Sequence, residues 1–147
     1  KKNQISLGEK FNVLPIASAH PKLKIADDGF SSTIGWFFEI KGVNIYVAGD
    51  TSLCDEILID LMKLPKINIG VLPVNEDNFF RRRRGIIGNM SIREAFGMAD
   101  ALKMEKMVPV HWDMFEINST LPSEILSVYK GYDWNFKLIM NLEELFK

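Results

Sequence analysis

The chain has 147 residues, of which 47% are hydrophobic and 25% are charged, a balance typical of a globular domain and not of a disordered or fibrous chain. Its formal net charge is −1, so the surface as a whole has no field that would gather nucleic acid or anionic lipid. A single cysteine, Cys54, excludes an internal disulfide, and no apolar run reaches the roughly 18 residues of a transmembrane helix. We therefore expect a cytoplasmic protein with no membrane partner.

The first half of the chain is dominated by strand patterns. Residues 11–20 are apolar with β-branched residues and a proline, which favours an edge strand that leads into a loop. Residues 33–40 and 43–47 predict two strands joined by a tight hairpin at Lys41-Gly42, because glycine supplies a positive φ. Apolar residues at helical spacing predict a helix over 52–64 that Pro65 ends.

The second half alternates strands and helices. Residues 67–74 form a near-continuous apolar run, as expected of a strand covered on both faces, and a charged, irregular stretch follows. Ser91 and Glu94 make a capping-box pattern that predicts a helix from residue 91 to about 104, before a short buried strand at 107–111. A helix around 123–129, a short strand near 136–140 and a turn over 142–146 complete an α/β fold, which we assign to a single domain, residues 1–147.

Three potential metal ligands each follow a predicted strand: His20, Asp50 and His111. In α/β sheets, ligands gather at one end of the strands, so these side chains are expected to converge. Each has an alternative interpretation. A lone histidine is most often structural or solvent-facing, and Asp50 is also well placed to cap the helix that begins near Leu53.

The motifs considered together resemble a known family. They are AHP at His20, VAGDTS at Asp50, LPVN, GNMSIREAFGMADAL, and VPVHWDMFEIN at His111. In this order they are similar to the later motifs of the metallo-β-lactamase fold, and residues 72–118 are most similar to the L-ascorbate-6-phosphate lactonases. The resemblance implies the C-terminal half of an αββα sandwich, a mixed sheet with outer helices.

The same resemblance implies a site and a reaction. Asp50 would bridge two divalent ions, manganese or zinc, while His20 binds one ion and His111 the other. A metal-generated hydroxide would then open the lactone of a phosphorylated sugar acid, with Asp50 as the catalytic carboxylate.

The sequence departs from the family pattern at the remaining ligands. That family's other metal ligands lie in a His-x-His-x-Asp-His stretch, which is absent from these 147 residues. The chain also opens without Met and enters an apolar stretch within about ten residues, so we expect it to be a piece that lacks the N-terminal half. A catalytic ion needs about three protein ligands, so this piece alone is expected to be inactive.

A second group of residues suits a phosphate ester, because guanidinium and amide groups donate hydrogen bonds to its oxygens. The residues are Asn75, Arg81, Arg82, Arg83, Arg84 and Asn89. The alternative for the arginine run is a solvated charged loop. A phosphodiesterase or ribonuclease of the same fold is a further alternative, although the slightly negative net charge makes a nucleic acid partner unlikely.

An alternative hypothesis from a different functional class is that the chain is a non-catalytic module that pairs with another chain. Half of a sandwich exposes the sheet face that its other half would cover, and large apolar patches are rarely left bare. We therefore expect this chain to associate with itself or with the missing N-terminal half.

Overall fold

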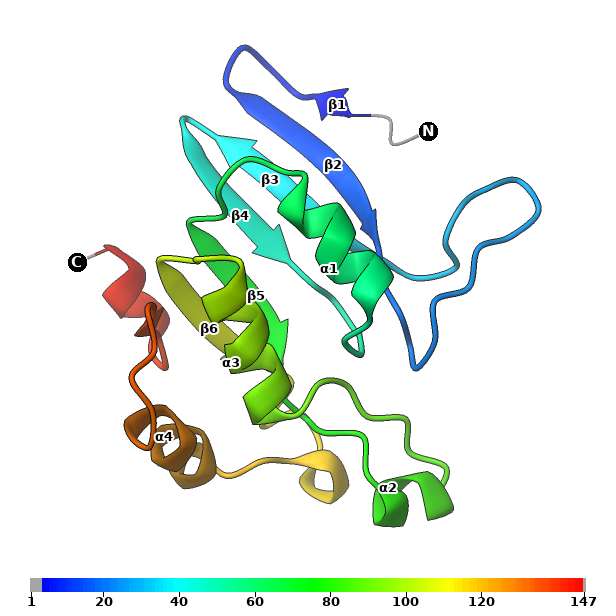
Figure 1. Cartoon of the computed structure of the whole chain (residues 1–147), viewed down its shortest axis with the longest axis vertical. Helices are drawn as coiled ribbons and strands as arrows, with labels where there is room; N and C mark the ends of the chain where they lie inside the picture. Colours follow the sequence, from blue (N-terminus) through cyan, green and yellow to red (C-terminus); the bar gives the residue numbers. More distant parts are fainter. Residues whose placement is uncertain (1–3, 147) are drawn as a thin grey trace.

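The structure, a computed structural model, describes residues 4–146 and contains one mixed sheet with helices packed against it (Figure 1). The strands are β1 (Ile5–Ser6), β2 (Phe11–Ala17), β3 (Ile34–Ile40), β4 (Val43–Val47), β5 (Ile69–Pro73), β6 (Lys106–Val110) and β7 (Lys137–Leu138). The helices are α1 (Asp55–Met62), α2 (Phe79–Arg83), α3 (Ile92–Ala101) and α4 (Pro122–Lys130), with 3-10 turns η1 (Glu116–Asn118) and η2 (Leu142–Phe146). The predicted α/β class with a mixed sheet is confirmed.

Strands β1 to β4 form the antiparallel half of the sheet. The predicted hairpin between β3 and β4 is confirmed, with Lys41 at φ 50° and Gly42 at φ 86°. β2 is not quite the edge strand, since the two-residue β1 pairs with its start at Asn12 and Val13. Pro15 lies beyond the part that β1 covers, where its lack of an N–H on that side removes no ladder hydrogen bond.

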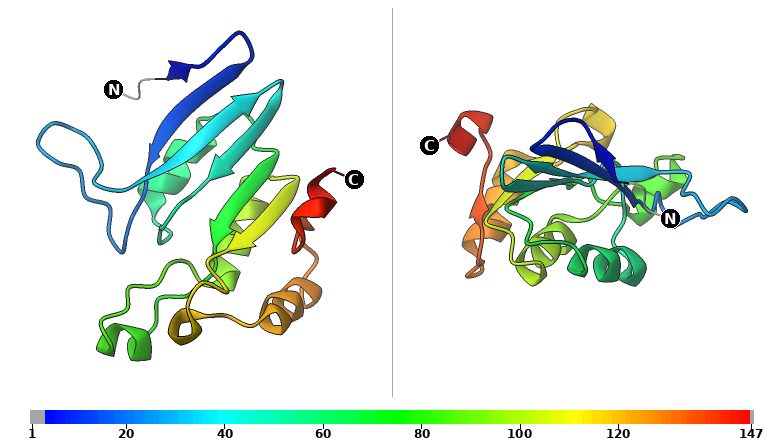
Figure 2. Two further views of the ribbon diagram at one scale, coloured as in Figure 1. Left: turned by 180° about the vertical axis from the view of Figure 1, so that it is seen from behind. Right: turned by 90° about the horizontal axis from the view of Figure 1, so that it is seen from above.

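Strands β4 to β7 form the parallel half, with α1 and α3 as crossover helices on the same side of the sheet (Figures 1 and 2). The capping box of α3 is confirmed, because Ser91 Oγ accepts from Glu94 N and the Glu94 side chain accepts from Ser91 N. α1 begins at Asp55, later than expected. Its N-cap is Cys54, so the alternative role of Asp50 as a helix cap is wrong.

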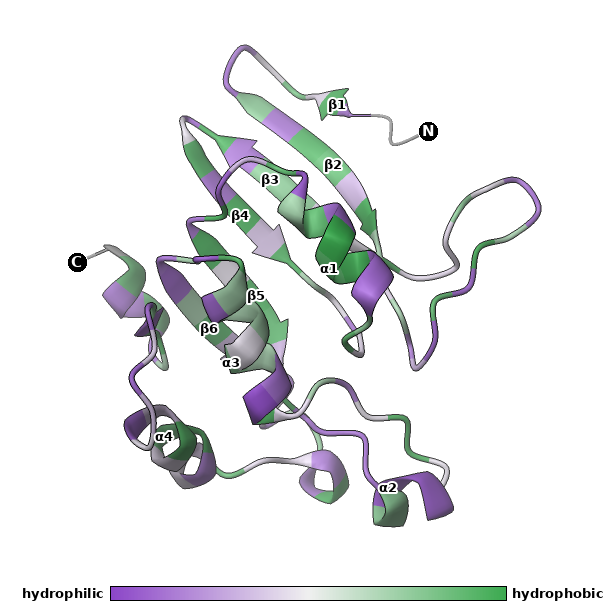
Figure 3. Ribbon diagram, viewed as in Figure 1, coloured by the Kyte–Doolittle hydropathy of each residue, from purple (hydrophilic) through white to green (hydrophobic). Residues whose placement is uncertain are grey.

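The core lies between the sheet and these two helices. Phe37 and Tyr46 face the helices and join a buried cluster with Phe96 of α3, which is also packed by the rings of Tyr129, Trp134 and Phe136. Figure 3 shows hydrophobic residues along the central strands. None of the helices of residues 4–146 is long and apolar enough to cross a membrane.

The opposite face of the sheet is also apolar. Because side chains alternate along a strand, the neighbours of Phe37 and Tyr46 point away from the helices. These neighbours are Trp36, Phe38, Ile45 and Val47, and all four remain partly exposed. The second face therefore presents a hydrophobic surface that the described residues do not fully cover.

Helix α2 was not predicted. Its N-cap Asn78 accepts a hydrogen bond from Arg81 N through its side chain, which starts a helix of only five residues. Phe79 and Phe80 are 59% and 75% exposed, so α2 has no buried apolar face. A helix without such a face lacks the periodicity from which helices are predicted.

Candidate metal centre

Four strands end at one edge of the sheet and deliver the candidate residues there. β4, β5 and β6 are parallel, and β2 runs in the same direction because it is antiparallel to β3, which is antiparallel to β4. His20 follows β2, Asp50 follows β4, Asn75 follows β5 and His111 follows β6. The strand directions thus bring all four segments to the same rim.

Asp50 and His111 lie side by side at this rim. His111 Nδ1 is 3.3 Å from Asp50 Oδ1, although the residues are far apart in the chain. The Asp50 side chain is 48% exposed and that of His111 27%, so both remain open to solvent. His111 has a φ of 61°, a conformation uncommon for residues other than glycine, and this turns the chain sharply at the end of β6.

Asn89 and Asn75 form a buried wall beside Asp50. The Nδ2 of Asn89 donates to Asp50 Oδ1 at 3.0 Å and to Asn75 Oδ1 at 2.8 Å. The two asparagines are 3% and 5% exposed. The structure therefore joins both residues to Asp50, and through it to His111, in a single chain of polar contacts.

His20 sits in the segment next to Asp50 but is not in direct contact with the pair. Its neighbour Ala19 donates from N to Thr51 Oγ1 at 3.0 Å and accepts at O from Ser52 N at 2.6 Å. The Nδ1 of His20 is buried and has no hydrogen-bond partner within the described residues. An imidazole nitrogen left in this state is one that a ligand could satisfy.

The donor set fits a divalent cation in part. Two imidazoles and a carboxylate suit zinc or manganese, and the orphaned Nδ1 of His20 is consistent with a missing partner. Within residues 4–146, however, no group of three or more His, Cys, Asp or Glu side chains lies close enough to hold an ion. The structure therefore brings two of the three candidate ligands, Asp50 and His111, into contact, and their role in metal binding stays a prediction.

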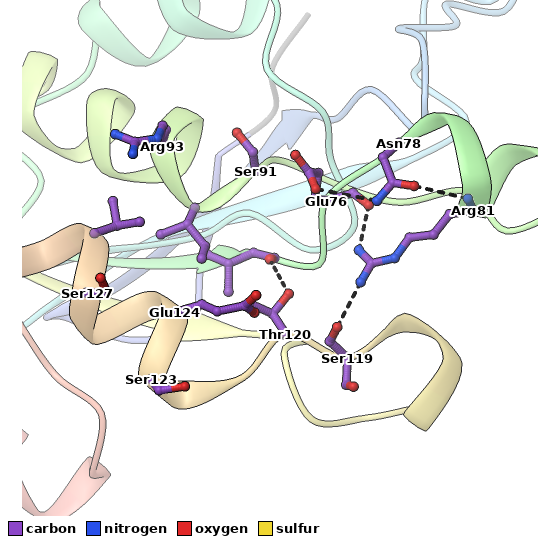
Figure 4. Close-up of a pocket in the computed structure, with 13 residues that line it drawn as sticks. Glu76, Asn78, Arg81, Ser91, Arg93, Ser119, Thr120, Ser123, Glu124 and Ser127 are labelled. Carbon is purple, nitrogen blue, oxygen red and sulfur yellow. Dashed lines mark hydrogen bonds between the residues drawn. The ribbon is translucent and has the colours of Figure 1, made fainter.

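Arg81 has a structural task among the four arginines. Its Nη1 donates to Glu76 O at 2.7 Å and its Nη2 to Ser119 O at 2.8 Å. The guanidinium thus ties the loop after β5 to the segment after β6 (Figure 4). Its remaining N–H groups make no hydrogen bond within residues 4–146 and can donate to a ligand.

The other three arginines are exposed. Arg82 Nε lies 3.6 Å from Asp77 Oδ1, and the guanidinium of Arg83 lies 5.8 Å from the centre of the Phe79 ring. Arg84 forms the C-terminal cap of α2 through its backbone N–H. These contacts agree with a solvated charged surface and leave a substrate role for Arg82, Arg83 and Arg84 as a prediction.

A pocket of about 670 Å³ opens beside Arg81, between the starts of α3 and α4 (Figure 4). Its lining is polar and of mixed charge, with Glu76, Arg81, Arg93 and Glu124 among its members. Val74 and Glu76, the two chain neighbours of Asn75, line it, and so does Ser91, which lies two residues after Asn89. The pocket is therefore a direct neighbour of the wall that contacts Asp50.

Thr51 was missed by the sequence reasoning. It is 1% exposed, and its Oγ1 accepts from Ala19 N and donates to Ser52 O. Its backbone O accepts from Met90 N at 3.1 Å, one residue beyond Asn89. Its position directly after Asp50 in the motif VAGDTS was the available signal.

Comparison with known proteins gives a family match. Residues 1–112 match the family described as the beta-lactamase superfamily domain. A UPF0173 metal-dependent hydrolase from Anoxybacillus flavithermus is 29% identical over 97 residues, which are 66% of this chain and 38% of the relative.

Two solved structures share the fold. Igni18, a metallo hydrolase from Ignicoccus hospitalis, matches with a TM-score of 0.66 at 19% identity. The match covers 95% of this chain and 54% of the Igni18 chain. An isothiocyanate hydrolase from Delia radicum gut bacteria matches with a TM-score of 0.69 at 16% identity, and the match covers 95% of this chain and 56% of the hydrolase chain. The chain thus spans well under two thirds of the length of these relatives.

Proposed function

The chain belongs to the beta-lactamase superfamily, and from this we propose that it supplies part of the metal centre of a metal-dependent hydrolase. The contact between Asp50 and His111, 3.3 Å apart at the rim of the sheet, is the observation that carries the proposal. His20 would be a third ligand, because its buried Nδ1 has no partner among the described residues. Protein groups outside these 147 residues would complete the site, since a catalytic ion needs about three ligands.

Each residue of the rim would have a defined task. A divalent cation would supply Lewis acidity toward a carbonyl and a hydroxide nucleophile near neutral pH. Asp50 contributes its exposed carboxylate, whose Oδ1 is already held by Asn89 and His111. His111 contributes an imidazole whose place is set by the sharp turn after β6. The chain's own role is to hold these groups still at a solvent-accessible edge.

For the substrate, we propose a phosphorylated sugar lactone. The resemblance of residues 72–118 to ascorbate-6-phosphate lactonases motivates it, and Arg81 supports it. Two hydrogen bonds to backbone carbonyls hold the Arg81 guanidinium, so it would lose little further freedom on binding a phosphate. The adjoining pocket has room for a small ligand.

We also propose that the open sheet face is the surface on which the rest of the enzyme packs. Trp36, Phe38, Ile45 and Val47 are apolar and partly exposed there. Apolar patches of this kind mark interaction sites on soluble proteins. Pairing with a protein segment that carries further metal ligands would cover this face and bring those ligands to the rim.

The test is metal analysis and lactonase assays on the intact natural protein, as wild type and as Asp50→Ala. We expect manganese or zinc in the wild type, and loss of both bound metal and lactone hydrolysis in the variant. Gly97→Ala, an exposed change in α3 with open space around it, is the control for folding. Equal metal content in wild type and Asp50→Ala would refute the proposed site.

The assay panel separates the remaining alternatives. Hydrolysis of sugar-acid lactone phosphates, and not of RNA or phosphodiesters, would favour the lactonase. An intact protein that binds no metal and hydrolyses none of these compounds would favour the non-catalytic module.

A further inference from the structure

We propose that Asn89, itself oriented by Asn75, is a positioning residue that holds the Asp50 carboxylate in place for a metal ion. The inference rests on the proposed function, because it gives Asp50 the role of a ligand. It assigns the two asparagines a task different from the substrate binding predicted from the sequence. Neither residue needs to touch the ion or the substrate for this task.

The first argument is the direction of the hydrogen bonds. An amide NH₂ group has two protons, and those of Asn89 are both used, one on Asp50 Oδ1 and one on Asn75 Oδ1. The opposite orientation of the amide would place its oxygen against two other oxygens. The Asp50 carboxylate, together with the Asn75 oxygen, therefore favours the orientation of Asn89 in which an N–H points at Asp50.

The second argument is the cost of this orientation. The Oδ1 of Asn89 is buried and has no hydrogen-bond partner within residues 4–146. A buried acceptor without a partner destabilises a fold by about 1–3 kcal/mol. The hydrogen bonds that Asn89 Nδ2 donates, one of them to Asp50 Oδ1, offset this cost.

The third argument is the set of backbone hydrogen bonds that fixes the segment around Asn89. Asn89 N donates to Asn75 O at 3.1 Å, and Asp77 N donates to Asn89 O at 3.0 Å. Met90 N donates to Thr51 O, which fixes the same segment to the residue that follows Asp50. Backbone hydrogen bonds thus hold Asn89 to the loop after β5 and the next residue, Met90, to the segment of Asp50.

The consequence concerns the free oxygen of Asp50. Only Oδ1 has contacts among the described residues, to Asn89 at 3.0 Å and to His111 at 3.3 Å. With Oδ1 anchored, rotation of the half-exposed carboxylate is restricted, and Oδ2, which has no hydrogen bond to the described residues, is left to bind a cation. Groups that orient metal ligands in this way typically change metal affinity by about 10- to 100-fold.

The experiment is a calorimetric titration of the intact, metal-free protein with Mn²⁺ and Zn²⁺. Asn89→Leu removes the donor at similar size, and we expect its Kd to rise about 10- to 100-fold. Asn75→Leu should raise Kd less, and the double variant should be no weaker than Asn89→Leu, because Asn75 acts through Asn89. Asn118→Leu is the matched control, since Asn118 is also a buried asparagine with an unpartnered Oδ1 but has no contact with Asp50.

A second measurement needs no metal. The side-chain amide signals of Asn89 in the NMR spectrum of the metal-free protein should shift in Asp50→Ala, while those of Asn118 stay in place. Where Asn89→Leu fails to fold, Asn89→Ala replaces it in the titration.

The outcomes separate this inference from the proposed function. If Asp50→Ala loses the metal but Asn89→Leu binds it as tightly as Asn118→Leu does, the positioning role is wrong and the proposed function stands. If Asp50→Ala keeps the metal, both are overturned. Unchanged Asn89 amide signals in Asp50→Ala would also reject the positioning role.

Discussion

The rim that carries Asp50 and His111 and the aromatic cluster under α3 are held together in different ways. At the rim, Asn89 Nδ2 donates one hydrogen bond of 3.0 Å to Asp50 Oδ1 and one of 2.8 Å to Asn75 Oδ1, so each contact depends on a single pair of atoms. In the cluster, Phe96 meets three rings at centroid distances of 5.4 to 6.0 Å, and none of these contacts depends on one atom. A change of volume should therefore damage the cluster most, and a change of one polar atom should damage the rim most.

The comparison is tested most strongly at Phe96, which is fully buried. Phe96→Ala leaves a cavity among Tyr129, Trp134 and Phe136, and we expect a loss of about 3–5 kcal/mol in the free energy of unfolding. Urea denaturation measures this loss. Metal affinity of the protein that remains folded should be unchanged, and a parallel loss of affinity would show that the two regions are coupled.

At Gly88, next to Asn89, two backbone segments of the rim pack closely against each other. A Cβ at Gly88 would lie 2.4 Å from both Asp77 N and Glu76 O, so the backbone would have to move. We expect Gly88→Ala to cost about 1–3 kcal/mol of stability and also to weaken metal binding, since Asn89 follows directly. Thermal denaturation and titration of the same sample measure both effects.

The control for Gly88 is Gly97, in the middle of α3. A Cβ there meets nothing within 4 Å, so Gly97→Ala should stabilise the helix by roughly 0.5–1 kcal/mol. If Gly88→Ala behaved like Gly97→Ala, the close backbone approach would not be what positions Asn89.

Replacement of Tyr46 has a small expected effect, and its sign is stabilising, as for Gly97→Ala. Its hydroxyl is buried and has no partner among the described residues, so Tyr46→Phe should raise stability by about 1 kcal/mol at neutral pH. Burial, and to a lesser extent Cys54, raises the pKa of Tyr46 above its usual value of 10.0. The folded protein thus resists ionisation of Tyr46 more than the unfolded chain does.

The pH dependence follows from this difference. Below about pH 10, Tyr46 is neutral in both states and its ionisation does not change the free energy of unfolding. Above that value the free energy of unfolding falls, because Tyr46 ionises more readily in the unfolded chain. Wild type should therefore lose stability more steeply than Tyr46→Phe in alkaline denaturation series. Parallel pH profiles for the two proteins would mean that Tyr46 is hydrated in solution.

Local patterns were enough to predict most of the fold. The hairpin at Lys41-Gly42 and the capping box at Ser91 and Glu94 depend on residues within four positions of one another, so both are visible in the sequence. β1 and α2 are two and five residues long, which is too short for a periodic pattern. α1 starts late because Ser52 N is held by Ala19 O, a contact between distant segments.

The site shows the same limit more sharply. Strand order predicts that His20, Asp50 and His111 reach one edge, and the strand directions agree. The contact between Asn89 and Asp50 spans 39 residues, and no local pattern encodes it. Residue types alone indicated phosphate binding for Asn75 and Asn89, which stays a prediction. An amide suits many partners, so the contact of Asn89 with Asp50 is visible only in the fold.

The backbone of His111 has a consequence for the long-term durability of this protein. Its φ of 61° places a side chain where glycine is at ease, at a cost of roughly 1 kcal/mol or more. Directed evolution for heat resistance would be drawn to this position, because glycine, and to a lesser degree asparagine, adopts this φ with less strain. Each such gain would sacrifice the imidazole, so robustness and chemistry compete at one residue.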